Sequence, residues 1–192
     1  MYDAVQDIYC YEGTTVLKNL LDSREQNLLD EFEAAMTTQR SDEPLPLGLL
    51  DVTHYCAIHH HLFQDVYSWA GEFRTVRIGK GGSAFCYPEH IDQEMQTLFN
   101  ELKRQDYLCG LSTDVFAERA AHFLATLNAI HPFREGNGRV QTSFLLLLAD
   151  HAGHPLNLDR LDPERFLQAM VTSFEGDERP LVTELKTLAR TS

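Results

Sequence analysis

The chain has 192 residues, of which 43% are hydrophobic and 23% charged, and its formal net charge is −13 at pH 7. This length suits one domain whose core needs no disulfide or metal support, so a single domain over residues 1–192 is predicted. The acidic excess argues against direct nucleic-acid binding, which requires basic patches. It is compatible with a basic protein partner, and more simply with a surface that serves solubility alone.

Membrane insertion, secretion and disulfide bonding are not expected from this sequence. No segment approaches the roughly 18 to 20 apolar residues of a membrane-spanning helix, and the N-terminus lacks the basic and apolar regions of a signal peptide. The four cysteines form no Cys-x-x-Cys pair and no disulfide framework. Free cysteines suit a reducing compartment such as the cytosol.

The first part of the chain predicts two helices joined by an exposed loop. One helix ends near Arg40, residues 41–46 combine charge with proline as exposed turns do, and a second helix begins near Leu50. Three consecutive histidines occupy residues 59–61, with His54 five residues before the first of them. Because neighbouring residues on a helix point in different directions, metal binding there has odds of only about one in ten.

A β-hairpin is predicted between residues 73 and 87. Residues 73–78 alternate as in a half-buried strand, residues 79–83 form a glycine-rich turn, and residues 84–87 return. On pattern alone an ordinary surface hairpin is the simpler interpretation. A nucleotide-binding P-loop fits less well, because the spacing Gly-x-x-x-x-Gly-Lys-(Ser/Thr) is absent.

Helices dominate the rest of the chain. Ser112 and Thr113 suit the cap of a helix whose apolar face continues to Ile130, and residues 140–149 are an almost unbroken apolar stretch that predicts a buried helix. Asp162 and its following proline predict the start of another helix, and a last short helix begins near Pro180. The fold class predicted is therefore all-α, a mainly helical bundle of about seven helices with one small hairpin.

The nine residues from His131 to Arg139, His-Pro-Phe-Arg-Glu-Gly-Asn-Gly-Arg, lie between two of these helices. His131 can accept a proton near neutral pH, and Glu135 is an oxygen ligand suited to Mg²⁺. Gly136 and Gly138 lack a Cβ, so backbone N–H groups can approach an anion at the helix N-terminus. Arg139 can donate to phosphate oxygens. Each residue alone is weak, but their order indicates phosphate chemistry.

This run resembles the signature of the Fic domain family, His-x-Phe-x-(Asp/Glu)-Gly-Asn-Gly-Arg-x-x-Arg, and matches it from His131 to Arg139. Residues 9–11, 16–19 and 58–71 also look like family segments, so the resemblance covers most of the chain. It implies the mainly helical Fic fold and a protein AMP-transferase (protein adenylyltransferase). Such an enzyme transfers AMP from its substrate ATP to a Ser, Thr or Tyr hydroxyl of a target protein and releases pyrophosphate.

The resemblance also implies a role for each residue of the run. His131 would be the catalytic base that deprotonates the target hydroxyl. Glu135 would hold Mg²⁺ on the nucleotide phosphates, and Arg139 would steady the phosphate beyond the one attacked. Phe133 would anchor the loop and serve structure alone. The anion hole for the phosphate would consist of Gly136, Asn137 and Gly138.

The hairpin gains a functional interpretation from the same resemblance. In the family a hairpin flap above the active site pairs with an extended target segment, which is strand addition to an exposed edge. The sequence Trp69-Ala70-Gly71 before the hairpin resembles the segment that precedes such a flap. The residues expected to dock the target are Val76, Arg77, Ile78, Gly79, Lys80, Gly81 and Gly82.

One position departs from the signature, because Thr142 stands where the family has a second arginine. In the family that arginine grips the γ-phosphate of ATP, and a hydroxyl cannot supply its charge. The grip is expected to weaken on the order of tenfold. The expectations, in order, are weaker use of ATP, another donor nucleotide, or a catalytically weak nucleotide- or partner-binding module. Phosphorylation, the activity of a sister group, fits less well because that group usually lacks the complete Gly-Asn-Gly core.

The family's self-inhibitory motif, (Ser/Thr)-x-x-x-Glu-(Gly/Asn), finds no match in these residues. Near matches at Glu12-Gly13 and Glu175-Gly176 have Ile8 and Val171 at the Ser/Thr position. In family terms the chain therefore looks like the toxin of a toxin–antitoxin pair, whose inhibitory glutamate comes from a separate small antitoxin protein. The expected location is the bacterial cytoplasm, or a host cytosol if the chain is part of an effector.

Overall fold

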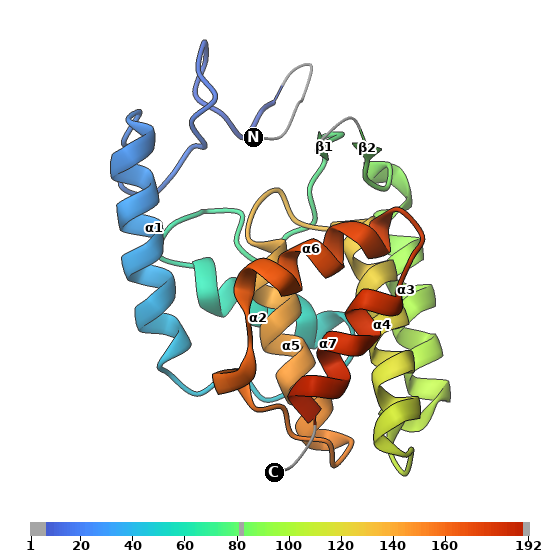
Figure 1. The fold of residues 1–192 in the computed structure, drawn as a ribbon. Coiled ribbons are helices and arrows are strands. Elements are labelled where there is room, and N and C mark those ends of the chain that lie inside the picture. The colour runs from blue at the N-terminus through green and yellow to red at the C-terminus, as the bar shows by residue number, and fades with distance from the viewer. Residues whose placement is uncertain (1–6, 81–82, 190–192) are drawn as a thin grey trace. The chain divides into compact units, whose positions relative to one another are not determined.

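The structure, a computed structural model, describes residues 7–80 and 83–189. Two strands, β1 (Gly79–Lys80) and β2 (Ser83–Ala84), pair antiparallel, and seven α-helices account for most of the described chain. This confirms the predicted all-α class. The helices, labelled in Figure 1, are α1 (Gln26–Ser41), α2 (Val52–Phe63), α3 (Pro88–Arg104), α4 (Thr113–Ile130), α5 (Asn137–His151), α6 (Pro163–Phe174) and α7 (Arg179–Ala189).

The chain forms two compact units. The first unit comprises Met1–Asp92 with His131–Val140, and the second comprises Gln93–Ile130 with Gln141–Ser192. Helices α1 and α2 and the hairpin belong to the first unit, whereas α4, α6 and α7 belong to the second. The single domain predicted for the whole chain stays a prediction.

The second unit is built from helices that pack through apolar faces. Helices α4, α6 and α7 contact one another, and the buried positions of α4 recur every three or four residues, as an amphipathic helix requires. Helix α6 begins as predicted, because the Asp162 side chain accepts hydrogen bonds from the N–H groups of Glu164 and Arg165. Helix α5 begins three residues before the predicted start at residue 140, because Asn137 and the two residues after it already form its first turn.

Helix α3 is missing from the elements predicted individually above. Its first residue is Pro88, a favoured helix start, and a buried apolar stripe follows it at helical spacing. That stripe consists of Ile91, Met95, Phe99 and Leu102.

In the first unit, α1 ends at Ser41 and α2 begins at Val52, close to the predicted boundaries. A two-pronged ion pair connects the end of α1 to the segment after α2. In it, Arg40 Nε lies 2.6 Å from Asp65 Oδ2, and Arg40 Nη2 lies 3.0 Å from Asp65 Oδ1. None of the helices in the described part of the chain is both long and apolar enough to cross a membrane.

The hairpin is present but shorter than predicted. Residues 73–78 keep the expected alternation, with Arg74 and Ile78 buried and Arg77 exposed, yet they are not a strand. The reason is that the carbonyls of Val76 and Cys86 accept hydrogen bonds from the Arg74 guanidinium instead of from a neighbouring strand. Residues 81 and 82, two of the predicted flap glycines, lie outside the described residues.

Candidate active site

The loop between α4 and α5 bends at two residues with positive φ. His131 has φ +50° and Gly136 has φ +81°. The left-handed conformation costs a non-glycine residue about 1 kcal/mol or more, so His131 must be held there by its surroundings. At Gly136 only glycine fits, because a Cβ would lie 2.3 Å from the tip of the Phe63 ring. The Gly136 carbonyl then accepts from the Val140 N–H at 3.2 Å, which begins α5.

Asn137 closes this loop with its side chain. Its Oδ1 accepts from the Phe133 N–H at 3.0 Å, and its Nδ2 donates to the Phe133 carbonyl at 2.8 Å. Both residues are buried, and the Phe133 ring stacks on Tyr55 and His59, which confirms that Phe133 anchors the loop. The Asn137 side chain, predicted for the anion hole, thus bonds the Phe133 backbone within the loop.

The N-terminus of α5 has the properties of an anion site. The first N–H groups of a helix have no acceptor within the helix, and its positive end favours negative charge. The first three residues of α5 are Asn137, Gly138 and Arg139, all predicted for phosphate binding. A Cβ built at Gly138 would meet nothing within 4 Å, so there is space beside this backbone for a ligand. Open space thus lies beside Gly138, whereas Gly136 is required by the turn.

Glu135 lies directly before this helix end. Its Oε1 accepts from the Gly136 N–H at 2.9 Å, and its carboxylate is partly exposed. Among the described residues there is no group of three or more His, Cys, Asp or Glu that could hold a metal by itself. Mg²⁺ usually takes one or two carboxylates and completes its shell with phosphate oxygens and water. One carboxylate beside a helix N-terminus that suits an anion therefore fits Mg²⁺ bound together with a nucleotide.

His59, one of the three consecutive histidines, bonds the backbone carbonyl of Glu135. Its Nδ1 accepts from the Gly71 N–H at 2.8 Å, and its Nε2 lies 3.0 Å from the Glu135 carbonyl oxygen. Burial lowers the pKa of His59 to about 3, so the ring is neutral near pH 7. Because Nδ1 is an acceptor, Nε2 carries the proton and donates to the Glu135 carbonyl. Two other histidines contact separate backbone segments, His54 at Pro46 and His61 at Arg40.

Arg139, the predicted phosphate clamp, is held over the Phe63 ring by α1. Its guanidinium carbon lies 4.6 Å from the ring centroid, Nη1 donates to Thr37 Oγ1 at 3.3 Å, and Nη2 pairs with Glu33. The other Glu33 oxygen accepts from the Tyr67 hydroxyl, whose pKa is raised by burial and by the Glu33 charge. No local pattern could have predicted this contact, because Glu33 lies 106 residues before Arg139.

The Arg134 side chain takes part in a buried ion pair with Asp7. Its Nη2 lies 2.6 Å from Asp7 Oδ2, with the side chains 6% and 10% exposed. The arginine at this unspecified position of the signature thus ties the N-terminal segment to the loop.

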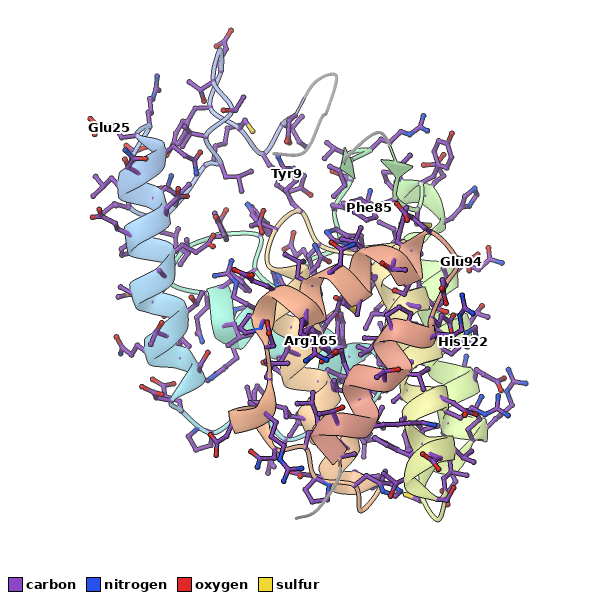
Figure 2. All side chains as sticks on the ribbon, in the orientation of Figure 1. Tyr9, Glu25, Phe85, Glu94, His122 and Arg165 are labelled. Carbon is purple, nitrogen blue, oxygen red and sulfur yellow. The ribbon has the colours of Figure 1, made fainter. Side chains whose placement is uncertain are left out.

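The hairpin contacts the predicted base. Phe85, labelled in Figure 2, follows β2 and stacks its ring on the His131 imidazole, with the ring centroids 3.8 Å apart and the planes 13° apart. Of the predicted docking residues, Ile78 is buried, Arg77 is exposed with its guanidinium over the Tyr87 ring, and Gly79 and Lys80 form β1. The described flap residues and the predicted residues from His131 to Arg139 thus fall in one unit.

Comparison with known proteins agrees with this geometry. The model of the Fic/DOC family matches residues 49–149, which is more than half of the chain. The probable protein adenylyltransferase y4lH of Sinorhizobium fredii is 52% identical over 186 residues, covering 96% of this chain and 97% of the relative. The probable protein adenylyltransferase Fic of Escherichia coli is 36% identical over 176 residues, covering 90% and 86%.

The same relationship is seen among solved structures. BepC of Bartonella tribocorum, described as a VirB-translocated effector protein and solved with bound AMPPNP, superposes with a TM-score of 0.83 at 27% identity. The match covers 96% of this chain and 97% of that one. With a family model over half of its length and relatives at 52% and 36% identity, the chain belongs to the Fic/DOC family.

Proposed function

We propose that this protein transfers AMP from ATP to a Ser, Thr or Tyr hydroxyl of a target protein. The observation that carries the proposal is one loop that holds a histidine at positive φ and, six residues later, an α-helix N-terminus with open space beside Gly138. A proton acceptor and an anion site on one loop suit attack on a phosphate. The relatives named protein adenylyltransferase agree with the reaction predicted from the sequence.

The reaction assigns a distinct task to each part of the loop. The His131 imidazole takes the proton of the target hydroxyl while that oxygen attacks the α-phosphorus of ATP. The new oxygen–phosphorus bond forms as the bond between the α-phosphorus and the bridging oxygen breaks, and pyrophosphate leaves. The N–H groups in the first turn of α5 bind the negative charge on the phosphate oxygens. The Arg139 guanidinium steadies the neighbouring phosphate.

Glu135 is the residue that would hold Mg²⁺. When bound, this ion neutralises charge on the phosphates and orients them. The contribution of the chain is to fix the carboxylate: the Gly136 N–H holds one oxygen, and the neutral His59 ring holds the Glu135 carbonyl. The loop is then preorganised before the nucleotide arrives.

The target protein is proposed to dock on the hairpin as an added strand. A short β1–β2 pair offers backbone groups to an extended segment, and the stacking of Phe85 on His131 puts this hairpin next to the base. We also propose a small antitoxin as partner, because the 192 residues contain no self-inhibitory motif. The bacterial cytoplasm, or a host cytosol for an effector, stays a prediction.

The proposal is tested with purified protein, Mg²⁺ and a bacterial lysate, with ATP labelled on the α-phosphate in one sample and on the γ-phosphate in another. A protein band labelled only from the α-phosphate is expected, and His131→Ala should remove it while binding AMPPNP as the wild type does. Label from the γ-phosphate would instead identify phosphorylation. Undiminished label in His131→Ala would reject His131 as the base.

A second candidate function is favoured by Thr142, which stands three residues after Arg139 in α5. Without the second arginine, recognition of the donor would rest on its α- and β-phosphates, which are assigned above to the first turn of α5 and to Arg139. The same lysate assay with α-labelled GTP, CTP and UTP distinguishes the donors. Label from one of these nucleotides and none from ATP would replace AMP by another nucleotide fragment, and AMPPNP binding without any transfer would favour a nucleotide-binding module.

A further inference from the structure

Arg74 is a buried arginine that neither the motif nor the proposed mechanism uses. Its side chain is 2% exposed and donates to three backbone carbonyls: Nε to His131 at 2.8 Å, Nη1 to Val76 at 2.8 Å and Nη2 to Cys86 at 2.7 Å. Its own backbone N–H donates to the Pro132 carbonyl at 2.9 Å. One residue thus bonds two consecutive peptides of the loop and both arms of the hairpin.

In the loop, the Arg74 side chain bonds His131, a non-glycine residue with an unfavourable backbone conformation. His131 has φ +50°, a conformation that a non-glycine residue adopts only where its surroundings impose it. The bond from Arg74 Nε holds the His131 carbonyl in the direction that this conformation gives it. The imidazole is held separately, by the Phe85 ring stacked on it.

The planar guanidinium is the group that makes this link possible. It presents several donors in a fixed fork, whereas a lysine ammonium is a compact point charge on a flexible stem. The positions of the Val76 and Cys86 carbonyls relative to the His131 carbonyl are therefore set by one rigid group. Phe85 adds a second connection, because its N–H donates to the Ile78 carbonyl across the hairpin at 3.2 Å.

We propose that Arg74 is a positioning residue, which holds the backbone of His131 at a fixed place relative to the hairpin on which the target docks. A hydroxyl on the docked segment then arrives within reach of the imidazole. This inference rests on the proposed function. Because misplacement of reacting groups by about 1 Å can cost on the order of a hundredfold in rate, a loose link should appear in turnover.

The test compares Arg74→Lys with Arg40→Lys. Arg40 also joins two segments of the first unit through its guanidinium, but it bonds Asp65 and Glu43 and not the loop. The measurements are the rate of α-label transfer to the lysate band, the AMPPNP affinity with Mg²⁺, and the melting temperature. For Arg74→Lys we expect a loss of rate of about a hundredfold with an AMPPNP affinity within about threefold of wild type, because the carbonyls that its guanidinium bonds, in His131, Val76 and Cys86, are not groups of the anion site. Arg40→Lys should keep both.

Two results would overturn the proposal. One is a rate for Arg74→Lys equal to that of Arg40→Lys, which would make the link irrelevant to the reaction. The other is a loss of AMPPNP affinity as large as the loss of rate, which would indicate general disorder of the loop.

Native-state hydrogen exchange of the wild type covers the case in which Arg74→Lys fails to fold. The Arg74 amide bonds the loop, at Pro132, and the Phe85 amide bonds across the hairpin, at Ile78. The proposal requires both amides to open with the same free energy and the same denaturant dependence. Separate opening refutes it whatever the activity, whereas joint opening without any transfer of label refutes only the proposed reaction.

Discussion

The two units of the protein solve the problem of burial in different ways. The second unit buries helices through apolar faces, while the first buries irregular backbone whose N–H and carbonyl groups need partners. Polar side chains supply many of those partners. Among the residues that the structure describes, the buried polar or charged ones are Thr37, His54, His59, Arg74, His131, Arg134 and Asn137 in the first unit, and Gln141, Ser173 and Glu184 in the second.

Because of this difference, substitutions in the first unit are expected to harm function as well as stability. In the first unit a buried side chain often determines the position of a backbone group in the loop, as His59 does for Glu135 and Asn137 does for Phe133. In the second unit, an ion pair such as that of Lys186 with Asp114 joins the side chains of two helices and involves no loop backbone. Matched substitutions in the two units can test the contrast.

The largest difference in stability is expected between alanine substitutions at one glycine of each unit. Gly136 and Gly153 have nearly the same φ, +81° and +79°, but a Cβ would strike Phe63 at Gly136 and meet nothing within 4 Å at Gly153. Strain and overpacking together predict that Gly136→Ala lowers the free energy of unfolding by about 4 kcal/mol, against about 1 kcal/mol for Gly153→Ala. Urea unfolding measures both. Equal losses would mean that Phe63 moves aside freely.

The next largest difference between the units is expected when one partner of an ion pair is removed. The quantity compared is the loss in unfolding free energy. Asp7→Ala leaves the Arg134 cation buried, since their side chains are 10% and 6% exposed, whereas Asp114 and Lys186 are 70% and 28% exposed. We expect Asp7→Ala to cost about 3 kcal/mol and Asp114→Ala less than about 1 kcal/mol in unfolding free energy. A cost below 1 kcal/mol at Asp7 would show that Arg134 finds another partner without loss.

The unfolding free energy should depend on pH in part through the protonation of His59. Its pKa is lowered to about 3 in the folded protein, so below the usual value near 6.5 the unfolded chain binds a proton that the folded chain does not. Stability present above pH 6.5 is therefore lost as the pH falls toward 3, by up to about 1.4 kcal/mol per pH unit.

The check is urea unfolding between pH 6 and pH 4. In His59→Gln the slope of unfolding free energy against pH should be smaller than in the wild type by up to about 1.4 kcal/mol per pH unit. His151→Gln, an exposed change in the second unit, should leave the slope as it is. An unchanged slope in His59→Gln would mean that His59 is protonated in the folded protein.

The smallest effect concerns nucleotide affinity. Glu33 neutralises Arg139, so Glu33→Gln should free its charge for a phosphate while the amide oxygen still accepts from the guanidinium. We expect the AMPPNP dissociation constant to fall about threefold, the range of a partly exposed ion pair. Calorimetry with Glu184→Gln, which removes the carboxylate paired with Arg165 in the second unit, is the control. Weaker binding in Glu33→Gln would show that the carboxylate mainly orients Arg139.

The sequence predicted the parts of the molecule that depend on local pattern. Apolar periodicity and caps located α4 and α6, and the order of residues from His131 to Arg139 located the loop and its helix. The supports of the loop were missed, because Arg74 and His131 lie 57 residues apart and Asp7 and Arg134 lie 127 apart. Such contacts leave no period in the sequence.

One signal could have revealed Arg74. In the alternating residues 73–78, Arg74 shares a face with Val76 and Ile78, and a charged residue on the inward face of such a segment needs buried partners. For Glu33 the sequence offers no comparable sign, since it lies among other acidic residues of α1.

Phe63 links two features of the loop that would otherwise vary independently. The same ring forbids a Cβ at Gly136 and supports the Arg139 guanidinium. A smaller residue at position 63 would therefore leave room for a Cβ at position 136. It would also remove the ring against which the Arg139 guanidinium packs. In evolution, or in attempts to redesign the donor specificity, substitutions at Phe63, Gly136 and Arg139 are thus expected to occur together.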